Sequence, residues 1–187
     1  MYAGHFAAGL ALKARTPAAP TWGLLVGIGL LDILFGPFVL LGIERVTITP
    51  GISPGFSLDY IDWSHSLLMS IVWSLAYAAC FARYGRRVMA AMAVAVFSHF
   101  VLDWPMHPAD LALWPGSTAH LGLGLWRVLP TGWWFVELAV ILAGLAYYWR
   151  RARGDRSFGG RATAVAVTVV ILHVLNAPWL AAGQMPR

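Results

Sequence analysis

The residues of this chain that could do chemistry are histidines and aspartates placed inside or beside long apolar stretches. His99 and Asp103 end one such stretch, in Ser98-His99-Phe100-Val101-Leu102-Asp103, and Asp62-Trp63-Ser64-His65 opens the stretch before it. An imidazole or carboxylate in hydrocarbon costs a few kcal/mol or more, so it usually has a function or a paired partner. On a helix, His99 and Asp103 share one face with Cβ atoms about 5–6 Å apart. Such a pair can give one metal ion a nitrogen and an oxygen ligand. The pattern therefore predicts a buried polar site that binds metal.

The candidate ligands are imidazoles and carboxylates spread along the chain. They are His5, Asp32, His65, His99, Asp103, His107 and His120. His with Asp and open positions suits a catalytic zinc or a two-metal site, at which activated water is a nucleophile near neutral pH. We expect one or two zinc ions, with another divalent metal as the alternative. Asp62 or Glu137 would be the general base or a hydrogen-bond partner of the ligands.

Several of these residues also have simpler interpretations. Asp62 could only cap the following helix, because an Asp there satisfies free N–H groups. His99 and Asp103 could form a hydrogen-bonded pair without metal. His173 lies midway along an apolar stretch, where a histidine is more often a satisfied core residue. Its role and that of Asp59 stay open.

The composition is that of a membrane protein. Of 187 residues, 59% are hydrophobic and 11% are charged, whereas soluble domains carry about 25% charged residues. The net charge of +5 could suggest nucleic acid, but the basic residues form short clusters between apolar runs. Such clusters are a topology signal, so we expect no nucleic-acid partner. The single cysteine, Cys80, excludes an intrachain disulfide.

Six apolar segments would position these residues in a single all-α membrane domain, a helical bundle over residues 1–187. Five segments are long enough to cross a bilayer, which takes roughly 20 apolar residues. They cover about 22–43, 64–82, 88–104, 130–149 and 162–182. A shorter N-terminal helix, about 2–12, would be only half inserted. Gly36-Pro37 should kink or end the first span, and Thr47-Ile48-Thr49-Pro50 could be extended.

The basic residues predict the orientation. Ten of the thirteen Lys and Arg lie in alternate connections between the segments, which the positive-inside rule assigns to the cytoplasm. Both termini would then be extracytoplasmic. In this layout, the segment ends that carry His65, His99 and Asp103 meet on the outer side, with His5 near them. The sequence thus predicts a multi-pass protein whose polar site faces outward.

The order of these motifs resembles a known family. His5, Asp32, Ser64-His65-Ser66-Leu67-Leu68 and Ser98-His99-x-x-x-Asp103 resemble the bacterial family of predicted inner-membrane metal-dependent hydrolases, over about residues 1–125. That family is distantly similar to zinc-dependent phospholipase C, an all-helical fold with a multi-zinc site. The resemblance implies His65, His99 and Asp103 as shared ligands, with Asp32 and His5 beside them.

The chain departs from the phospholipase pattern at its last ligands. In the phospholipase, a later His is followed four residues on by Glu. Here His120 matches the His, but Gly124 stands at the Glu position, and Glu137 could substitute for it.

Three functions follow as hypotheses. The first is a metal-dependent hydrolase of the bacterial inner membrane that cleaves a phosphoester or lipid headgroup on the outer side. The second is a non-catalytic accessory or metal-binding structural protein, because the phospholipase ligand set is incomplete. The third is a transporter with a relay of Asp32, Glu137 and His173. Membrane lipid is the expected partner, and protein partners stay open.

Overall fold

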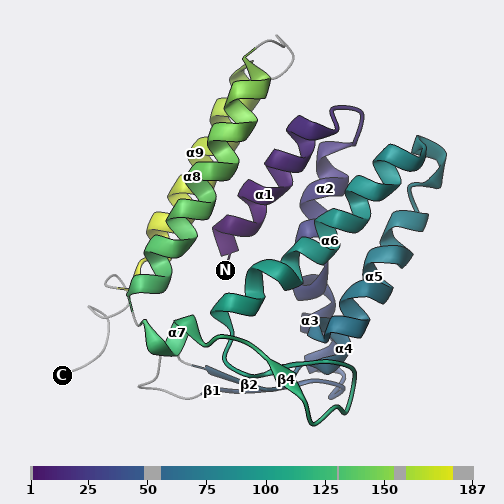
Figure 1. Cartoon of the computed structure of the whole chain (residues 1–187), viewed down its shortest axis with the longest axis vertical. Helices are drawn as coiled ribbons and strands as arrows, with labels where there is room; N and C mark the ends of the chain where they lie inside the picture. Colours follow the sequence, from purple (N-terminus) through teal and green to yellow (C-terminus); the bar gives the residue numbers. More distant parts are fainter. Residues whose placement is uncertain (1, 49–55, 130, 154–158, 179–187) are drawn as a thin grey trace.

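The computed structural model describes residues 2–48, 56–129, 131–153 and 159–178, and this part of the chain is mostly helical (Figure 1). Its helices are α1 (Tyr2–Arg15), α2 (Thr21–Ile28), α3 (Leu30–Leu40), α4 (Asp62–His65), α5 (Leu67–Ala79), α6 (Arg86–Met106), α7 (Leu125–Val128), α8 (Gly132–Ala152) and α9 (Gly159–Leu175). Two small antiparallel pairs, β1 (Arg45–Ile48) with β2 (Phe56–Tyr60) and β3 (Leu111–Ala112) with β4 (His120–Leu121), add to the helices. The predicted helical bundle is confirmed in this coarse sense. The expected extended stretch is β1 as far as Ile48, and Thr49 and Pro50 lie outside the described residues.

Two helices in the described ranges are long and apolar enough to cross a membrane. They are α6 and α8, with 21 residues each. The pair α2 and α3, bent by 51° at a break, adds a third span if the two helices are counted as one. α5 and the stretch Thr163–Leu175 of α9 are shorter apolar helices. The prediction of five spanning helices is therefore not supported.

The helix expected over 64–82 is shorter because the chain breaks at Ser66. Ser66 is extended (φ −68°, ψ 155°), and its hydroxyl accepts a hydrogen bond from the backbone N–H of Met69. Serine is favoured at this N-cap position because it satisfies one of the free N–H groups of the first turn. α5 keeps 13 residues, about 20 Å at the usual rise of about 1.5 Å per residue. His65 ends the separate turn α4 and does not lie on α5.

The span expected over 22–43 breaks at Gly29 and not at Gly36-Pro37. Gly29 (φ −97°, ψ 5°) separates α2 from α3, whereas Pro37 lies inside α3, which continues to Leu40. A glycine lowers helix stability by about 1 kcal/mol relative to alanine, so a bend is easiest there. The break places Asp32 in the first turn of α3, where free N–H groups favour a carboxylate.

α1 lies at the centre of the bundle, although the sequence predicted a half-inserted helix. Figure 1 shows α1 between the α8 and α9 pair and the group formed by α2, α5 and α6, and it packs against α2, α6, α8 and α9. A Cβ atom at Gly144 of α8 would lie 2.8 Å from the carbonyl oxygen of Ala7. Small residues of this kind let two membrane helices approach closely. This close contact holds α1, and with it His5, inside the bundle.

The basic helix ends lie together at one end of the bundle. Lys13 and Arg15 are in the last turn of α1, Arg86 begins α6, and Arg150 and Arg151 are in the last turn of α8. Figure 1 shows these ends at the top, with β1, β2 and β4 at the opposite end. The fold thus groups these basic residues on one side, as their alternation along the sequence predicts.

Candidate metal centre

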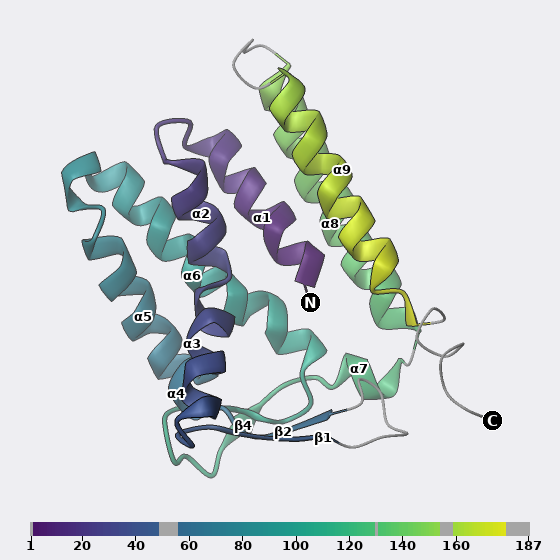
Figure 2. The same ribbon diagram turned by 180° about the vertical axis from the view of Figure 1, so that it is seen from behind.

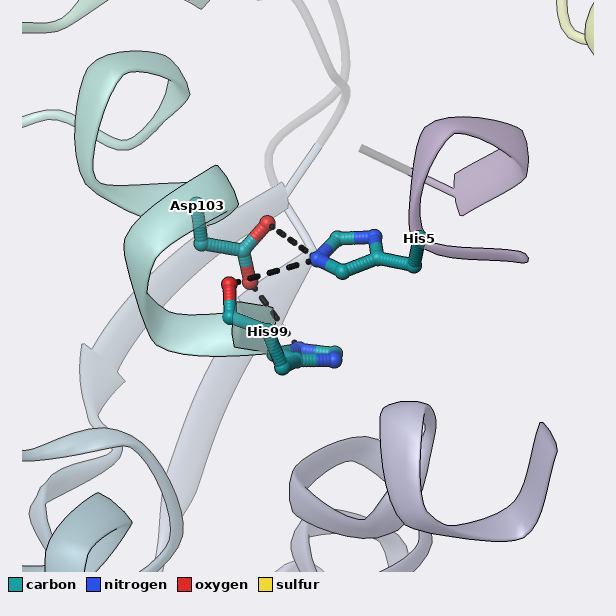
Figure 3. Close-up of side chains that lie close together, drawn as sticks. All are labelled: His5, His99 and Asp103. Carbon is teal, nitrogen blue, oxygen red and sulfur yellow. Dashed lines mark hydrogen bonds and ion pairs between the residues drawn. The ribbon is translucent and has the colours of Figure 1, made fainter. Parts of the chain in front are cut away.

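Histidines and aspartates from several elements converge at the half of the bundle nearer the strands. We call them the His/Asp cluster: His5 of α1, Asp32 of α3, His65 of α4, His99 and Asp103 of α6, and His107 just after α6. His5, His99 and Asp103 form one group whose potential ligand atoms all lie within 4.8 Å of one another (Figure 3), and Asp32, His65 and His99 form another. Because His99 belongs to both groups, they make one connected site.

Both ring nitrogens of His99 have defined surroundings. Nδ1 lies 2.6 Å from the carbonyl oxygen of Ile28, beside the helix break. A carbonyl oxygen only accepts, so Nδ1 carries a proton. Nε2 is buried and makes no hydrogen bond within the described part of the chain, yet it lies 3.0 Å from Asp103 Oδ2 and 3.7 Å from Asp32 Oδ1. A neutral ring would point a lone pair at two carboxylates, so a cation, either a proton or a metal ion, belongs between them.

Glu44 orients His65 through Ser64. The buried Glu44 carboxylate accepts the backbone N–H of Ser64 at 2.7 Å, and its two oxygens lie 2.9 and 2.8 Å from the Ser64 hydroxyl. The same hydroxyl lies 2.6 Å from His65 Nδ1. A hydroxyl has one proton. When it donates that proton to the carboxylate, its oxygen accepts Nδ1–H of His65. The lone pair of His65 is then on Nε2, which lies 3.5 Å from Asp32 Oδ1.

Burial shifts the ionisation of both ends of this chain of hydrogen bonds. Burial lowers the pKa of His65, against the opposing effect of Asp32, and so favours a neutral imidazole with a free lone pair. Burial raises the pKa of Glu44, and the hydrogen bonds from Ser64 oppose that effect. Glu44 is not among the site residues predicted from the sequence. Glu44 stands beside Arg45 at the end of an apolar run, and its partner Ser64 is twenty residues away. No short sequence motif therefore indicates a site at Glu44.

His107 and His5 also direct Nε2 toward Asp103. His107 Nδ1 lies 3.0 Å from Asp110 Oδ1, and its Nε2 lies 3.6 Å from Asp103 Oδ2. His5 Nε2 lies 3.3 Å from Asp103 Oδ1 and 3.3 Å from the backbone carbonyl oxygen of His99. Metal-binding histidines usually donate their other ring N–H to a carboxylate, a backbone carbonyl or water. His99 and His107 follow this pattern, and His65 follows it with a serine hydroxyl.

Besides His107, three predicted site residues lie outside the two ligand groups. Asp62 Oδ2 accepts the backbone N–H of Gly116 at 2.8 Å and ties α4 to the connection between β3 and β4. The N-cap position of α4 is Ile61 and not Asp62, so the capping interpretation of Asp62 is wrong. His120 is exposed on β4, with Nδ1 3.1 Å from the carbonyl oxygen of Thr118. The roles of Asp62 as a general base and of His120 as a ligand stay predictions.

Glu137, the last of these three residues, forms a hydrogen bond with the backbone at the start of α1. Its Oε1 accepts the backbone N–H of Gly4, next to His5, at 3.0 Å. Its Oε2 lies 3.7 Å from Nδ1 of His173, whose ring stacks on Trp134 with centroids 4.2 Å apart. Glu137 and His173 are both buried. Glu137 therefore holds the backbone beside His5, and its predicted role as a base is untested.

A cavity of about 410 Å³ reaches the cluster between α1, α2 and α3. Phe6, Leu25, Val26 and Ile33 are among its apolar lining, and His5, Asp32 and His99 are its ionisable lining. The Asp32 side chain is 48% exposed, compared with 5% for Asp103. Asp32 is therefore the carboxylate of the cluster that a ligand or water in the cavity can reach.

The comparisons with known proteins agree with a membrane location. The model of a family described as YdjM inner membrane protein matches residues 61–180, a range that contains His65, His99 and Asp103 but not His5 or Asp32. No curated protein and no solved structure matches the chain. The comparisons therefore support a bacterial inner-membrane family and give no support to a relationship with phospholipase C. Because the match extends over more than half of the sequence, the chain belongs to the YdjM inner membrane protein family.

Proposed function

We propose that the protein is a metal-dependent hydrolase of the bacterial inner membrane that acts on phosphoester or lipid-headgroup bonds. The His/Asp cluster would hold one or two zinc ions, with another divalent metal as the alternative. The observation that carries the proposal is His99 Nε2, a buried nitrogen that faces Asp103 and Asp32 while Nδ1 donates to Ile28. Imidazole nitrogen and carboxylate oxygen together form the donor set of catalytic zinc sites.

The two ligand groups limit how metal could be held. Because Nδ1 of His99 is engaged by Ile28, both groups draw on the same Nε2. One ion can take His99 with Asp103 and His5, or with Asp32 and His65. A second ion would have to use the ligands that the first leaves free, either Asp32 with His65 or Asp103 with His5 and His107. When bound, the metal would supply Lewis-acid activation of water.

The chain's own residues have separate tasks in this proposal. Glu44 and Ser64 hold His65 with its lone pair toward Asp32, and Ile28 does the same for His99. Asp32 borders the cavity, so an ion held by its carboxylate could be reached by water from there. Glu137 fixes the backbone beside His5. Asp62 holds the connection from β3 to β4 through the backbone N–H of Gly116.

The finer membrane topology is also part of the proposal. The basic helix ends lie opposite the strands, and the positive-inside rule assigns such ends to the cytoplasm. The half of the bundle with the His/Asp cluster would then face the extracytoplasmic side in a multi-pass protein with both termini outside. Membrane lipid is the expected partner.

One observation favours the non-catalytic alternative, a metal-binding structural or accessory protein. His5, His99 and Asp103 are all buried, as ligands of a structural metal often are. The cavity beside Asp32 favours the hydrolase, because a structural site needs no opening. The transporter hypothesis has only the buried pair Glu137 and His173 in its favour.

Metal analysis of detergent-purified protein tests the proposal. We expect zinc in the wild type and its loss in Asp103→Asn, which keeps the side-chain shape and removes the charge. Asp59→Asn is the matched control, because Asp59 is exposed and accepts a hydrogen bond from Thr47 on the strand pair. Equal metal in all three proteins would exclude the group that contains Asp103, and equal metal in His99→Gln as well would refute the metal site, because both groups use His99. Metal binding without hydrolysis of any lipid phosphoester offered in vesicles would refute the hydrolase and support the structural alternative.

A further inference from the structure

We propose that the cavity between α1, α2 and α3 receives a membrane lipid with a phosphate headgroup, which enters sideways from the bilayer. Its apolar chain would lie against α2 and α3, and its headgroup would lie at Asp32 and His99. The part of this inference that concerns the headgroup rests on the proposed function. The part that concerns the apolar chain of the lipid does not. The lipid would be the substrate class of the proposed hydrolase.

The lining of the cavity is divided between apolar and polar ends. Leu25, Val26 and Ile33 supply apolar surface, and Asp32 and His99 supply the polar end. The volume of about 410 Å³ lies within the range of about 300–1,000 Å³ typical of small-molecule pockets. An amphiphilic molecule fits such a lining better than a fully polar or a fully apolar one.

The mouth of the cavity lies on an apolar helical surface. Val26 is 38% exposed and Ile33 is 53% exposed, and Trp22 on the same α2 and α3 pair is 60% exposed. Figure 2 shows α2 and α3 on the near face of the molecule, between α1 and α5. Together the two helices are long and apolar enough to form a broken span. In an inner membrane protein such a surface faces hydrocarbon, so a lipid can reach the cavity without leaving the bilayer.

Gly29 keeps this entrance open. It lines the cavity at the break between α2 and α3. A Cβ atom there would meet no atom closer than 3.7 Å, so a larger side chain would extend into open space and not into a neighbour. The break also turns the first turn of α3 so that Asp32 borders the same space.

The polar end selects a phosphate only when a cation is present. Asp32 and Asp103 would repel a phosphate headgroup on their own, because like charges at short range disfavour each other. A metal ion at His99 would make the local electrostatic potential positive and attract phosphate oxygens. Headgroup selectivity should therefore depend on metal, and occupation by the apolar chain should not.

Photo-crosslinking in vesicles tests the inference. The full chain is reconstituted in phosphatidylcholine that contains a small fraction of phosphatidylglycerol with a photoactivatable group in its acyl chain. Mass spectrometry then compares labelling of Leu25, Val26 and Ile33 with that of Leu75 on α5 and Leu142 on α8. These two reference residues are exposed and report ordinary lipid contact. We expect the cavity residues to be labelled several-fold more than the references.

Gly29→Leu and Gly36→Leu form a matched pair. A Cβ atom at Gly36 would meet no atom within 4 Å, and Gly36 does not line the cavity. Gly29→Leu should reduce cavity labelling to the reference level, and Gly36→Leu should leave it high, with thermal melts showing that both variants fold. Equal labelling of cavity and reference residues in the wild type, or full labelling in Gly29→Leu, would overturn the inference.

The metal-free variant separates this inference from the proposed function. Asp103→Asn should keep high cavity labelling and lose the preference for phosphatidylglycerol over a photoactivatable diacylglycerol. If the wild type binds no metal but its cavity is still labelled selectively, the proposed function fails and the lipid cavity stands. If the wild type binds metal and the cavity is labelled like the references, the lipid cavity fails alone.

Discussion

Replacing Ser64 with alanine would disconnect Glu44 from His65 without touching a proposed ligand. The change removes the hydroxyl that lies 2.6 Å from His65 Nδ1 and within 2.9 Å of both Glu44 oxygens. Glu44 keeps the backbone N–H of Ser64 at 2.7 Å, so its charge is not left without a partner. The main loss falls on His65, whose proton is no longer held on Nδ1.

The size of the effect follows from these contacts. Loss of the hydrogen-bond partner of a metal-binding histidine typically weakens metal binding by about 10–100-fold. At about 1.4 kcal/mol for each factor of ten, this is about 1.4–2.8 kcal/mol. Folding stability should fall by about 1–3 kcal/mol as well, because a buried imidazole N–H loses its acceptor.

Ser74→Ala is the matched control. Ser74 is also a buried serine, but its hydroxyl donates to the carbonyl oxygen of Ser70 within α5. Zinc affinity would be measured by competition with a chromogenic chelator in detergent, with a thermal melt of each apo protein beside it. Ser64→Ala should bind zinc at least about ten-fold more weakly, and Ser74→Ala should match the wild type.

Two results would refute the reasoning. The first is a Ser64→Ala variant with wild-type zinc affinity. The second is additivity in a double-mutant cycle with Glu44→Gln, because residues that act through one hydrogen-bond chain should show coupled effects. A Ser64→Ala protein that is destabilised but binds zinc normally would mean that Glu44 and Ser64 only support the fold.

Three further predictions concern packing, metal removal and pH. Gly144→Val should push α1 away from α8, because a Cβ atom there would lie 2.8 Å from the Ala7 carbonyl oxygen. The free energy of unfolding should fall by about 1–3 kcal/mol, and a melting temperature equal to that of Gly36→Ala would contradict this. A chelator should lower the melting temperature of the wild type, since a ligand of the folded state stabilises it, and an equal drop in Asp103→Asn would argue against the site. Burial raises the pKa of Glu44 above 4.5, so its stabilising contribution is present below pH 4.5 and is lost as pH rises through the folded-state pKa. The stability of the wild type relative to Glu44→Gln should therefore fall from pH 4.5 to neutral, and a constant difference in melts would count against this assignment.

The sequence carried enough information to predict the centre of the site. His99 and Asp103 are four residues apart on a long apolar helix, and helical geometry alone places them side by side. The alternation of basic connections placed His65 and His5 at the same end of the bundle. These inferences depend on local spacing and on topology, both of which can be read along the chain.

The break at Gly29 and the division at Ser66 were not predicted, because apolar runs hide helix ends. Hydropathy averages over about twenty residues, so 22–43 and 64–82 each looked like one span, and a kink was expected in the first of them only at Gly36-Pro37. In the structure each is divided between two helices. A serine before an apolar run is an N-cap signal, but at Ser66 that signal lies inside a longer stretch that is hydrophobic on average.

Glu44 could not be predicted, because its partner depends on the strand pair. β1 and β2 return the chain from Glu44 to α4, and this pairing brings Glu44 to Ser64. The register of such a pair depends on tertiary contacts, which the sequence does not display. The exposed position of His120 has the same origin, because β4 pairs with β3 beyond the ligand groups.

The central position of α1 has a consequence for how the protein is made. α1 is synthesised before its neighbours α6, α8 and α9, which follow it by some seventy residues or more along the chain. Contacts between distant segments form only after the later segment exists, so such pairing is slow. α1 can therefore complete its packing only after α6, α8 and α9 have been synthesised. A chain stopped before α8 would contain all six residues of the His/Asp cluster. It would still lack the packing of α1 against α8 and α9 that holds His5 among them.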